Sequence, residues 1–520
     1  MPQDFDVRIQ DEVYIGQNNK FPAHLLPPGV FQLIQNAFID DNRIFKRGGT
    51  SLVAAALGSQ IILGGSDYEP GGGIKEIVVN FNGAANAQLY KWTGSGSFSA
   101  IGSANLTKDT YMNFTQASNY LFGFNGVEVV DYDGTTVTRN RAGVPKGSFA
   151  FWFHNYMFIG GVTSAPNRLY WSALGDPTTF DPADYVDINA NDGDVLTGLN
   201  ILNDELIVFK LYSIWAITGW SGTTFDVTTQ AGQNTQARAG GIGTPSHASI
   251  VSVGRDLYYL SFSGNVPSIR SLNQTVFAKT IDKGVVSEEI EDTMLGLSKG
   301  SLTRAYGAYD GKYIYWSLPD GASTTNDLII VLNPGQTYRT KYGEMHPWVI
   351  FDGVNAGGFI TSTISGRSRL YVFDSTAVGK VYLFNDTSVY SDDGTAIVMD
   401  VKTRDFMGDS ARQSKYKYLY FKYQTGSAGT LLVNSRIDQA QDFSLQESVD
   451  LSGNSPGLGP TGTFTLGTSI LGGSMITQNR VTFQHLTGSL LGVQFKESTA
   501  NSCELYDMQI YGMKKGFRNN

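Results

Sequence analysis

The sequence predicts an all-β protein with very few helices, in which a β-propeller is followed by a C-terminal β-sandwich. Three observations lead to this prediction. Charged residues make up only 16% of the chain, whereas it contains 60 Gly, 30 Phe and 27 Tyr; aromatic side chains fit a pleated sheet and glycine serves tight turns. Short apolar runs are separated by Asn-Gly and Asp-Gly pairs, which favour hairpin turns. Finally, a chain of 520 residues is too long for one compact core, and this length indicates several domains or one repeated architecture.

Residues 1–50 are predicted to form an N-terminal arm with a short helix. Phe31, Ile34, Gln35 and Phe38 follow two prolines and a glycine at helical spacing. The basic segment Phe45–Gly49 comes next. It lacks the GxxxxGK[ST] spacing that directs successive amides at a phosphate, so we do not expect nucleotide binding there.

Residues 51–395 are predicted to form the propeller. Pairs of apolar strands around a turn recur at irregular intervals of roughly 40 to 60 residues, as in repeated sheets. Four-stranded sheets repeated around an axis protect most of their edges. An array of β-sandwiches is the alternative. The clearest strand pairs are Tyr120–Val137, Arg255–Leu272, Tyr306–Gly321 and Arg367–Asp386.

One helix is expected within the propeller region, at Lys283–Ser298. Ser287 can cap its first turn, and the acidic residues that follow complement the positive end of the helix dipole. Ile290, Met294 and Leu297 share one face. We expect this face to pack on the propeller or on a neighbour.

Residues 396–520 are predicted to form the C-terminal β-sandwich. They contain 12 Lys or Arg and 10 Asp or Glu, whereas the preceding 395 residues carry a net charge of −11. The turn Ser391–Gly394 marks the boundary between these regions. The Gly- and Pro-rich loop Leu451–Gly462 is expected to be mobile or bound to a partner.

The segment Lys402–Lys422 combines basic residues with tyrosines. Strand alternation would place Tyr416, Tyr418, Tyr420 and Lys422 on one face. Such a strip could contact nucleic acid, an acidic protein partner or only solvent, and the small net charge of the region favours the last two. Its basic residues are Lys402, Arg404, Arg412, Lys415, Lys417 and Lys422.

Charge and hydropathy exclude several classes of protein. The net charge of −9 disfavours stable duplex binding over a broad face. The N-terminus has no apolar core of a secretory signal, and the longest apolar stretches, Leu52–Leu63 and Leu206–Ile217, are too short to span a bilayer. We therefore expect no membrane span.

Chemical motifs give no catalytic site, and we predict no catalytic, cofactor-binding or metal-binding residues and no enzymatic activity. The single cysteine, Cys503, is expected to be a small core residue. The string GNSPG around Ser455 lacks the strand and helix that a nucleophile elbow requires. The five histidines, which form no HxH, HxxxH or HExxH pair and are expected to be structural or at the surface, are His24, His154, His247, His346 and His485.

The segment Asp181–Asp194 concentrates five aspartates. Asp187, Asn189 and Asn191 resemble the start of a calcium loop, but Gly193 comes one position late and the twelfth position is Gly198. Asx-type turns between strands are the favoured interpretation, and a calcium site is the alternative.

Two stretches have a familiar sequence: NRLYWSALGDPTTFDPADY (Asn167–Tyr185) and NDGDVLTGLNILNDELIVFKLYSIWAITG (Asn191–Gly219). They resemble the propeller proteins of bacteriophage tails, in particular the tail nozzle family of short-tailed phages, also called packaged-DNA stabilisation or head-to-tail connector proteins. Further segments are similar to that family in order and spacing: Leu25–Thr50, Ser287–Met294, Arg404–Thr425 and Leu505–Gly512.

The resemblance implies a structural virion protein without an enzymatic role. It implies a homo-oligomer, a hexameric ring that extends the DNA channel below the portal and adaptor and retains, then releases, the packaged genome. The implied partners are portal and adaptor proteins and tail fibre, spike or needle proteins, with double-stranded DNA passing transiently through the lumen. The implied location is the phage tail, assembled in the host cytoplasm. Within this interpretation we expect the N-terminal segment and the strip around Lys415 and Lys417 to make partner contacts.

The alternative is a carbohydrate-binding or depolymerising propeller of a phage tail. Exposed tryptophans beside aspartates would form a sugar platform, although blade cores use the same residues. The candidates are Trp152, Trp171, Trp215, Trp220 and Trp316.

Overall fold

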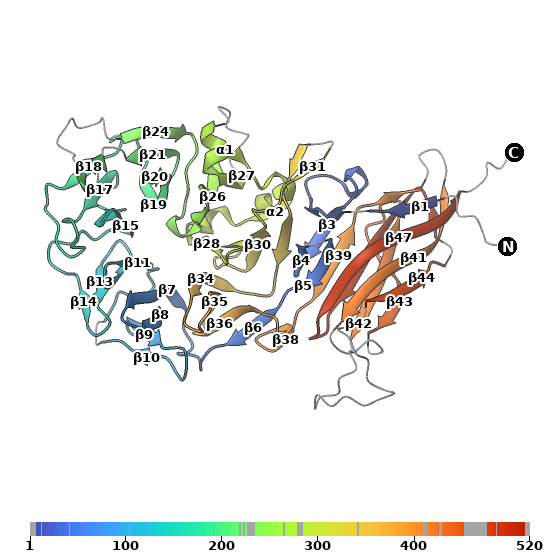
Figure 1. The fold of residues 1–520 in the computed structure, drawn as a ribbon, viewed down its shortest axis with the longest axis horizontal. Helices are drawn as coiled ribbons and strands as arrows, with labels where there is room; N and C mark the ends of the chain where they lie inside the picture. Colours follow the sequence, from blue (N-terminus) through green and yellow to red (C-terminus); the bar gives the residue numbers. More distant parts are fainter. Residues whose placement is uncertain are drawn as a thin grey trace. The chain divides into compact units, whose positions relative to one another are not determined.

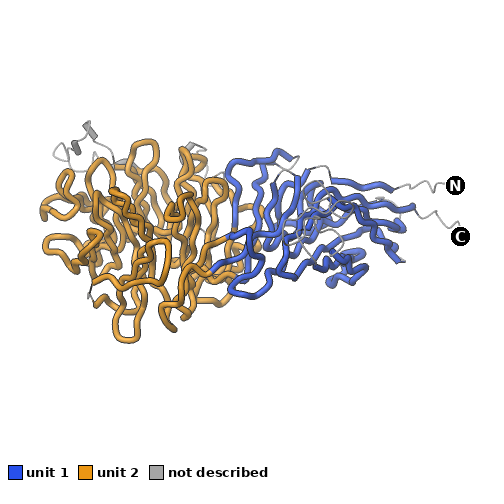
Figure 2. The backbone as a smooth tube through the Cα atoms, turned by 60° about the horizontal axis from the view of Figure 1, so that its bottom comes forward, with its two compact units in different colours: residues 1–51, 331–353, 385–520 blue, residues 52–330, 354–384 orange. Residues whose placement is uncertain are grey.

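A computed structural model describes residues 7–11, 13–40, 42–102, 105–190, 192–217, 220–221, 224–225, 235–263, 266–277, 284–340, 343–408, 413–425, 429–451, 476–484 and 486–514. The chain forms two compact units, coloured separately in Figure 2. The propeller unit comprises Leu52–Ile330 and Val354–Phe384. The sandwich unit comprises Met1–Ser51, Val331–Gly353 and Asn385–Asn520.

This division differs from the predicted domains at 1–50, 51–395 and 396–520. The first 51 residues belong to the sandwich unit instead of forming a separate arm, and residues 331–353 and 385–395 belong to it too. Net charge and composition indicated the position along the chain at which both change. They could not show that strands distant in sequence pair within one sheet.

The propeller unit consists of small antiparallel sheets arranged around an axis, as Figure 1 shows. Six small sheets form its blades, and strands β28–β30 lie between the fifth and the sixth, with β28 in contact with both β25 and β34. The first two blades are β7 (Ile62–Gly71), β8 (Ile74–Asn82), β9 (Ala87–Trp92) and β10 (Ser99–Ala100), then β11 (Asn113–Ala117), β12 (Tyr120–Phe124), β13 (Val129–Tyr132) and β14 (Val137–Arg139).

The remaining blades follow in chain order. The third and fourth are β15 (Phe149–Phe153), β16 (Tyr156–Gly160), β17 (Arg168–Trp171) and β18 (Tyr185–Asp187), then β19 (Leu196–Leu202), β20 (Glu205–Lys210), β21 (Ser213–Ile217) and β24 (Thr235–Gly240). The fifth and sixth are β25 (Val251–Val253), β26 (Asp256–Ser263) and β27 (Val266–Ser271), then β34 (Ala356–Ser362), β35 (Arg369–Asp374) and β36 (Val381–Asp386). Between the fifth and sixth blades lie β28 (Tyr306–Tyr309), β29 (Ile314–Leu318) and β30 (Leu328–Leu332). A separate two-stranded sheet is formed by β22 (Trp220–Ser221) and β23 (Thr224–Phe225). The predicted all-β fold and its propeller are confirmed.

The predicted hairpin turns explain how the blades reverse direction. Gly126 and Gly134 have φ values of 80° and 93°, which glycine adopts without the cost that a Cβ would bring. Asn125 Oδ1 accepts the N–H of Glu128 at 2.8 Å, and Asp133 Oδ1 accepts the N–H of Thr135 at 2.9 Å. Each side chain therefore closes its own turn.

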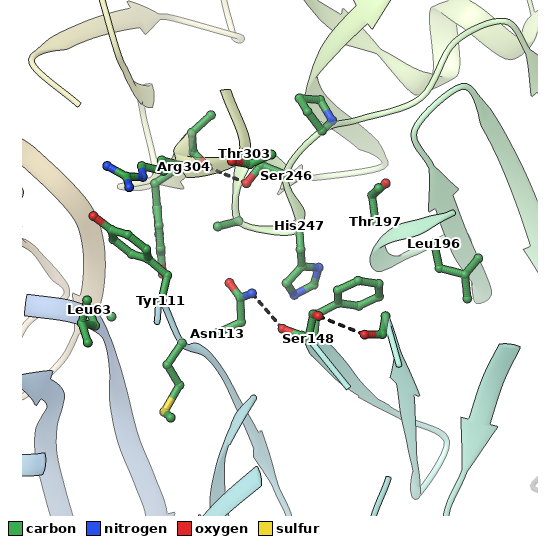
Figure 3. A pocket seen from close by; sticks show the side chains of 18 of the residues that line it. Leu63, Tyr111, Asn113, Ser148, Leu196, Thr197, Ser246, His247, Thr303 and Arg304 are labelled. Atoms are coloured by element: carbon green, nitrogen blue, oxygen red, sulfur yellow. Dashed lines mark hydrogen bonds between the residues drawn. The ribbon is translucent and has the colours of Figure 1, made fainter. Parts of the chain in front are cut away.

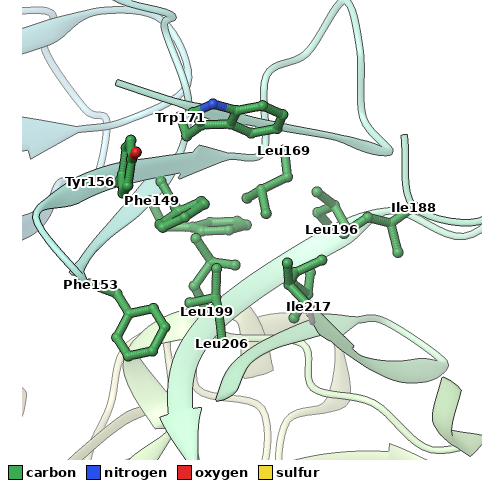
Figure 4. Close-up of a cluster of buried hydrophobic side chains, with 12 residues drawn as sticks. Phe149, Phe153, Tyr156, Leu169, Trp171, Ile188, Leu196, Leu199, Leu206 and Ile217 are labelled. Carbon is green, nitrogen blue, oxygen red and sulfur yellow. The ribbon is translucent and has the colours of Figure 1, made fainter. Parts of the chain in front are cut away.

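The blades are held together by apolar side chains packed between neighbouring sheets. Figure 4 shows one such cluster, between the third and fourth blades. Alternation along each strand directs these residues into the space between two sheets. The cluster includes Phe149, Phe153, Tyr156, Leu169, Trp171 and Ile188 from one blade and Leu196, Leu199, Leu206 and Ile217 from the next.

The described helices are short. The predicted helix at Lys283–Ser298 is present only as η4 (Glu288–Ile290) and α2 (Glu291–Gly296). Ile290, Met294 and Leu297 are buried as expected, but the Ser287 hydroxyl does not cap the helix and instead accepts the N–H of Ile269 at 3.0 Å. The other helices are α1 (Leu272–Phe277), η1 (Ala23–Leu25), η2 (His247–Ser249) and η5 (Lys299–Arg304), and no helix of the described residues is long and apolar enough to cross a bilayer.

Most of the described strands of the sandwich unit lie in two large sheets. One sheet has the order β4 (Ala37–Asp40), β5 (Arg43–Lys46), β47 (Cys503–Lys514), β41 (Ser414–Thr425) and β44 (Thr477–Thr482), with β1 (Val7–Gln10) on β47 and β45 (Thr487–Gly488) on β41. The other contains β33 (Trp348–Phe351), β3 (Val30–Gln35), β39 (Met399–Thr403), β46 (Leu490–Glu497), β42 (Thr430–Ile437) and β43 (Ser444–Asp450), with β2 (Gly16–Gln17) on β3 and β40 (Phe406–Met407) on β46. Phe421 and Phe495 face each other between the sheets, with ring centroids 5.2 Å apart. The other described strands of the unit are β6 (Gly49–Leu52), β31 (Tyr338–Thr340), β32 (Gly343–Met345), β37 (Ser391–Asp392) and β38 (Thr395–Ala396).

The predicted N-terminal helix is wrong, because Val30–Gln35 and Ala37–Asp40 are strands. Phe31, Ile34 and Phe38 are all buried. Their spacing therefore looks like one buried face of a helix, although they lie in two strands. A register shift in β3 places Phe31 and Ile34 on the inner face, and Asn36, with φ of 55°, turns the chain before β4. A bulge followed by a left-handed residue thus produces a helix-like pattern in two strands.

Arg47, from the segment predicted to be a basic loop, is fully buried in the sandwich unit. Its Nε donates to Asn36 Oδ1 at 3.0 Å, Nη2 to the Asp352 carbonyl at 3.0 Å, and Nη1 to Asp392 Oδ1 at 3.0 Å. These three partners come from the three separate segments that form the unit. One guanidinium therefore connects all of them.

Candidate functional sites

The innermost strands of the propeller surround a cavity of about 390 Å³, shown in Figure 3. A second cavity of about 410 Å³ shares Asn113, His247, Ala248 and Tyr306 with the first. These shared residues separate the two cavities. The sequence does not reveal the cavities, because each blade contributes only one or two short segments to their walls.

His247 forms the inner wall of the first cavity. Its Nδ1 accepts the N–H of Leu199 at 3.3 Å, and its ring stacks on Phe149 with centroids 5.2 Å apart. Burial lowers the pKa of His247 to about 4. The imidazole is therefore neutral at physiological pH and serves as a packing and hydrogen-bonding group.

Arg304 and Tyr111 lie together in the wall of the same cavity (Figure 3). The guanidinium carbon of Arg304 is 4.9 Å from the centroid of the Tyr111 ring, and an Arg304 N–H donates to the Thr324 carbonyl. No Asp or Glu is among the described residues that line the cavity. Its electrostatic preference is therefore for an anion.

Other polar groups of the cavity wall are engaged in connecting neighbouring strands. Asn113 Nδ2 donates to the Ser148 carbonyl at 2.9 Å, and Ser148 Oγ donates to the Gly161 carbonyl at 3.0 Å. Ser246 Oγ donates to the Ala305 carbonyl at 2.7 Å. These bonds stabilise the inner ring of the propeller.

The second candidate site is the outer face of the sandwich sheet that contains the predicted basic strip. The expected alternation along β41 is only partly correct, because the pairing with β47 shifts register between Tyr416 and Tyr418. Tyr416 points inward and is fully buried, whereas Tyr418, Tyr420 and Lys422 lie on the outer face and are half-buried. A bulge therefore removes one tyrosine from the predicted face.

We define the Tyr/Arg face as the outer-face residues Arg8, Lys415, Tyr418, Tyr420, Lys422, Arg480 and Tyr511 on β1, β41, β44 and β47. Tyr420 and Tyr511 meet edge to face with centroids 5.3 Å apart. The Arg8 and Arg480 guanidinium carbons lie 5.9 Å and 5.1 Å from the ring centroids of Tyr511 and Tyr418. Cation–π contacts thus hold both arginines against the aromatic row.

The structure brings together the two regions expected to contact partners. The N-terminal strand β1 pairs antiparallel with β47, with Arg8 opposite Tyr511, and β47 pairs with β41, with Tyr511 opposite Tyr418. The paired residues of β1 and β47 are about 500 positions apart in the chain, and the sequence does not indicate that they pair. Lys402 of the predicted strip lies instead in β39 of the other sheet, and Arg404, directly after β39, pairs with Asp11 at 2.8 Å. Arg412 is outside the described residues.

The Asp-rich segment forms the predicted Asx-type turns. Asp181 Oδ1 accepts the N–H of Ala183 at 2.9 Å, and Asp192 Oδ1 accepts the N–H of Asp194 at 3.0 Å. Across the part of the chain that the structure describes, no group of three or more His, Cys, Asp or Glu is placed to hold a metal ion.

Two aspartates of this segment also form ion pairs. Asp187 pairs with Arg168 at 2.7 Å, and the Arg168 guanidinium stacks over Tyr185 at 3.5 Å from the ring centroid. Asp192 accepts from the buried Lys210 Nζ at 2.6 Å. These carboxylates therefore satisfy buried or stacked cations of the third and fourth blades.

The remaining described candidates are either buried or in contact with a neighbouring side chain. His24 Nδ1 lies 3.0 Å from Gln439 Nε2, and His154 Nε2 lies 3.0 Å from Asp204. Cys503 is buried, which raises the pKa of its thiol. His485, Ser455 and the loop that follows Leu451 lie outside the described residues.

Among the side chains that the structure describes, the candidate tryptophans do not gather into an exposed platform. Trp171 and Trp316 are buried, and the Trp316 Nε1 donates to the Ser249 carbonyl at 3.0 Å. Trp152 and Trp215 are half-buried and pack against core clusters of different blades. The side chain of Trp220 is outside the described set.

Comparison with known proteins gives no match, either to a protein-family model or to a curated protein.

Proposed function

We propose that this chain is a structural component of a bacteriophage tail, a subunit of a hexameric nozzle or connector ring. The ring extends the DNA channel below the portal and adaptor, retains the packaged genome and then releases it. Its partners are further copies of the chain, the portal or adaptor, and tail fibre, spike or needle proteins. The protein resides in the virion after assembly in the host cytoplasm, and it performs no catalytic step.

The observation that carries this proposal is the location of the segments that resemble the nozzle family. Asn167–Tyr185 contains β17 and ends at the first residue of β18, and Asn191–Gly219 contains β19, β20 and β21 of the next blade. Arg404–Thr425 and Leu505–Gly512 fall on β40, β41 and β47 of the sandwich unit. The resemblance therefore covers the framework of both units, as expected for a shared architecture.

The polar groups at the centre of the propeller support a structural role. Asn113, Ser148 and Ser246 use their side chains to join neighbouring strands, and His247 is held neutral by burial. The net charge of −9 supports a wall along which DNA slides, because a surface that neutralises few phosphates holds the polyanion weakly.

The test is the mass and shape of the purified full-length chain. We expect mass photometry and light scattering to give six copies, and electron micrographs to show a ring whose channel is wider than duplex DNA, roughly 20 Å across. We expect only weak, salt-sensitive binding to a 30-base-pair duplex. A chain that stays monomeric at about 100 μM would overturn the proposal, and glycan hydrolysis by that chain would favour the depolymerising alternative.

The carbohydrate-binding alternative has one supporting observation, the pairing of Arg304 with Tyr111 in the wall of the first cavity. A cation beside an aromatic ring suits an acidic sugar. Calorimetry with glucuronate, on the wild type and on Arg304→Met, tests this alternative. Binding that the substitution abolishes would favour it, and no heat of binding at millimolar ligand would exclude it for this probe.

A further inference from the structure

Resting on the proposed function, we infer that the Tyr/Arg face binds the acidic propeller unit of a second copy of this chain. The face is the contact by which one subunit of the ring holds the next.

The Tyr/Arg face has more positive than negative side chains, within an acidic protein. Arg8, Lys415, Lys422 and Arg480 lie on it, and Lys422 is paired with Asp507 at 2.8 Å. Lys415 and Arg480 are exposed, and neither forms an ion pair within the described residues. The cations that remain available make this face a site for an acidic surface.

The face is also pre-organised for binding. Its tyrosines pack against one another on adjacent strands, with Tyr418 and Tyr420 centroids 6.3 Å apart and Tyr420 and Tyr511 centroids 5.3 Å apart. A rigid sheet fixes the backbone of all of them. Tyrosine and arginine are the residues most enriched at the energetic centres of protein interfaces, and held side chains lose little entropy on binding.

The propeller unit of a second copy has the complementary charge. It contains 19 Lys or Arg and 26 Asp or Glu, whereas the sandwich unit contains 19 and 21. A closed ring requires two different surfaces on each chain that fit each other head to tail. A positive face on the sandwich unit and a propeller unit with a net charge of −7 (19 minus 26) meet this requirement.

Duplex DNA is the other polyanion that this face could attract, and the whole-chain charge argues against it. A net charge of −9 repels a duplex at long range, and stable duplex binding requires neutralisation of several phosphates. We therefore assign the face to protein, and DNA binding becomes an outcome of the test.

The test compares two double variants that change the net charge equally. Lys415→Glu/Arg480→Glu reverses two exposed cations of the face. Lys146→Glu/Lys299→Glu reverses two exposed lysines of the propeller unit, for which no partner is present among the described residues. We expect the first variant to raise the dissociation constant of the ring contact by about 100-fold, and the second to leave the ring intact. Thermal midpoints should change by less than about 2 °C in both, since the four side chains are exposed.

A second measurement uses the wild type alone. Raising the salt concentration from about 50 to 500 mM should weaken the ring, because screening acts on charges that face each other across an interface. This measurement needs no substitution.

Each outcome has a separate meaning. A monomeric wild type would overturn the proposed function itself. A wild-type ring that survives both salt and Lys415→Glu/Arg480→Glu would overturn only the assignment of this face. Equal weakening by the two double variants would also overturn it, since net charge alone would then be the cause. Duplex binding by the wild type that the first variant loses, with unchanged mass, would reassign the face to DNA.

Discussion

Replacement of Arg47 by methionine is expected to destabilise the sandwich unit more than any substitution of a surface cation. The side chain of Arg47 has no exposed area, and that of Asp392, its carboxylate partner, is 11% exposed. Methionine keeps much of the stem that packs near Phe351, whose ring centroid is 5.4 Å from the guanidinium carbon. It removes the donors to Asn36, Asp352 and Asp392 together.

The magnitude follows from what these partners lose. Removal of one member of a buried, hydrogen-bonded ion pair costs about 3–5 kcal/mol, because the other charge remains desolvated without compensation. The sandwich unit comprises 210 residues, a size at which 1 kcal/mol corresponds to a shift of roughly 2–4 °C in the unfolding midpoint. The sandwich transition should therefore fall by about 10 °C. The unfolding midpoint of Arg47→Lys should lie between those of the wild type and Arg47→Met, since lysine keeps the positive charge but lacks the planar guanidinium group.

Scanning calorimetry measures the midpoint, and hydrogen exchange of the β3 and β39 amides reports on the sandwich unit separately. Lys415→Met is the matched control, because this exposed cation in the same unit should change the midpoint by less than about 2 °C. A shift for Arg47→Met no larger than that of the control would refute the view that one guanidinium connects the three segments.

Three further predictions concern buried groups. The pKa of His247 is about 4 in the folded chain, below its ordinary value of 6.5, so the unfolded chain takes up a proton first as the pH falls. The free energy of unfolding should therefore decrease between pH 6.5 and pH 4. In thermal melts across this range, His247→Phe should lose less stability than the wild type. Cys503, whose pKa is raised by burial, should react with a thiol reagent at least about 100-fold more slowly in the native chain than in urea, and equal rates would contradict its burial. Trp316→Phe should cost about 1–3 kcal/mol in urea unfolding, since the buried Ser249 carbonyl loses its indole donor, and an unchanged midpoint would show that another donor replaces it.

The features that sequence predicted well are those set by neighbouring residues. Asn125-Gly126 and Asp133-Gly134 form the expected turns because each side chain bonds to amides two or three positions later. The strand Tyr416–Thr425 is likewise present, within β41. In these cases the physical cause lies within a few residues, so the local pattern contains it.

The features that sequence missed depend on pairing between distant segments. A helix was predicted where β3 and β4 occur, because a bulge and the left-handed Asn36 imitate helical spacing. Nothing near Arg47 indicates that its partners are Asp352 and Asp392. The Tyr/Arg face was only half visible, since Arg8 reaches it through a strand pairing that joins the two ends of the chain.

That joining of the two ends has a consequence for synthesis. β47 pairs with β1, β5 and β41, so three strands made earlier each have an open edge until the ribosome has translated residues 503–514. At roughly 5–20 residues per second, β1 waits about half a minute to two minutes for its partner. Translation itself sets the earliest time at which the sandwich can close, and a nascent chain that stops before Cys503 presents bare strand edges to any other chain nearby.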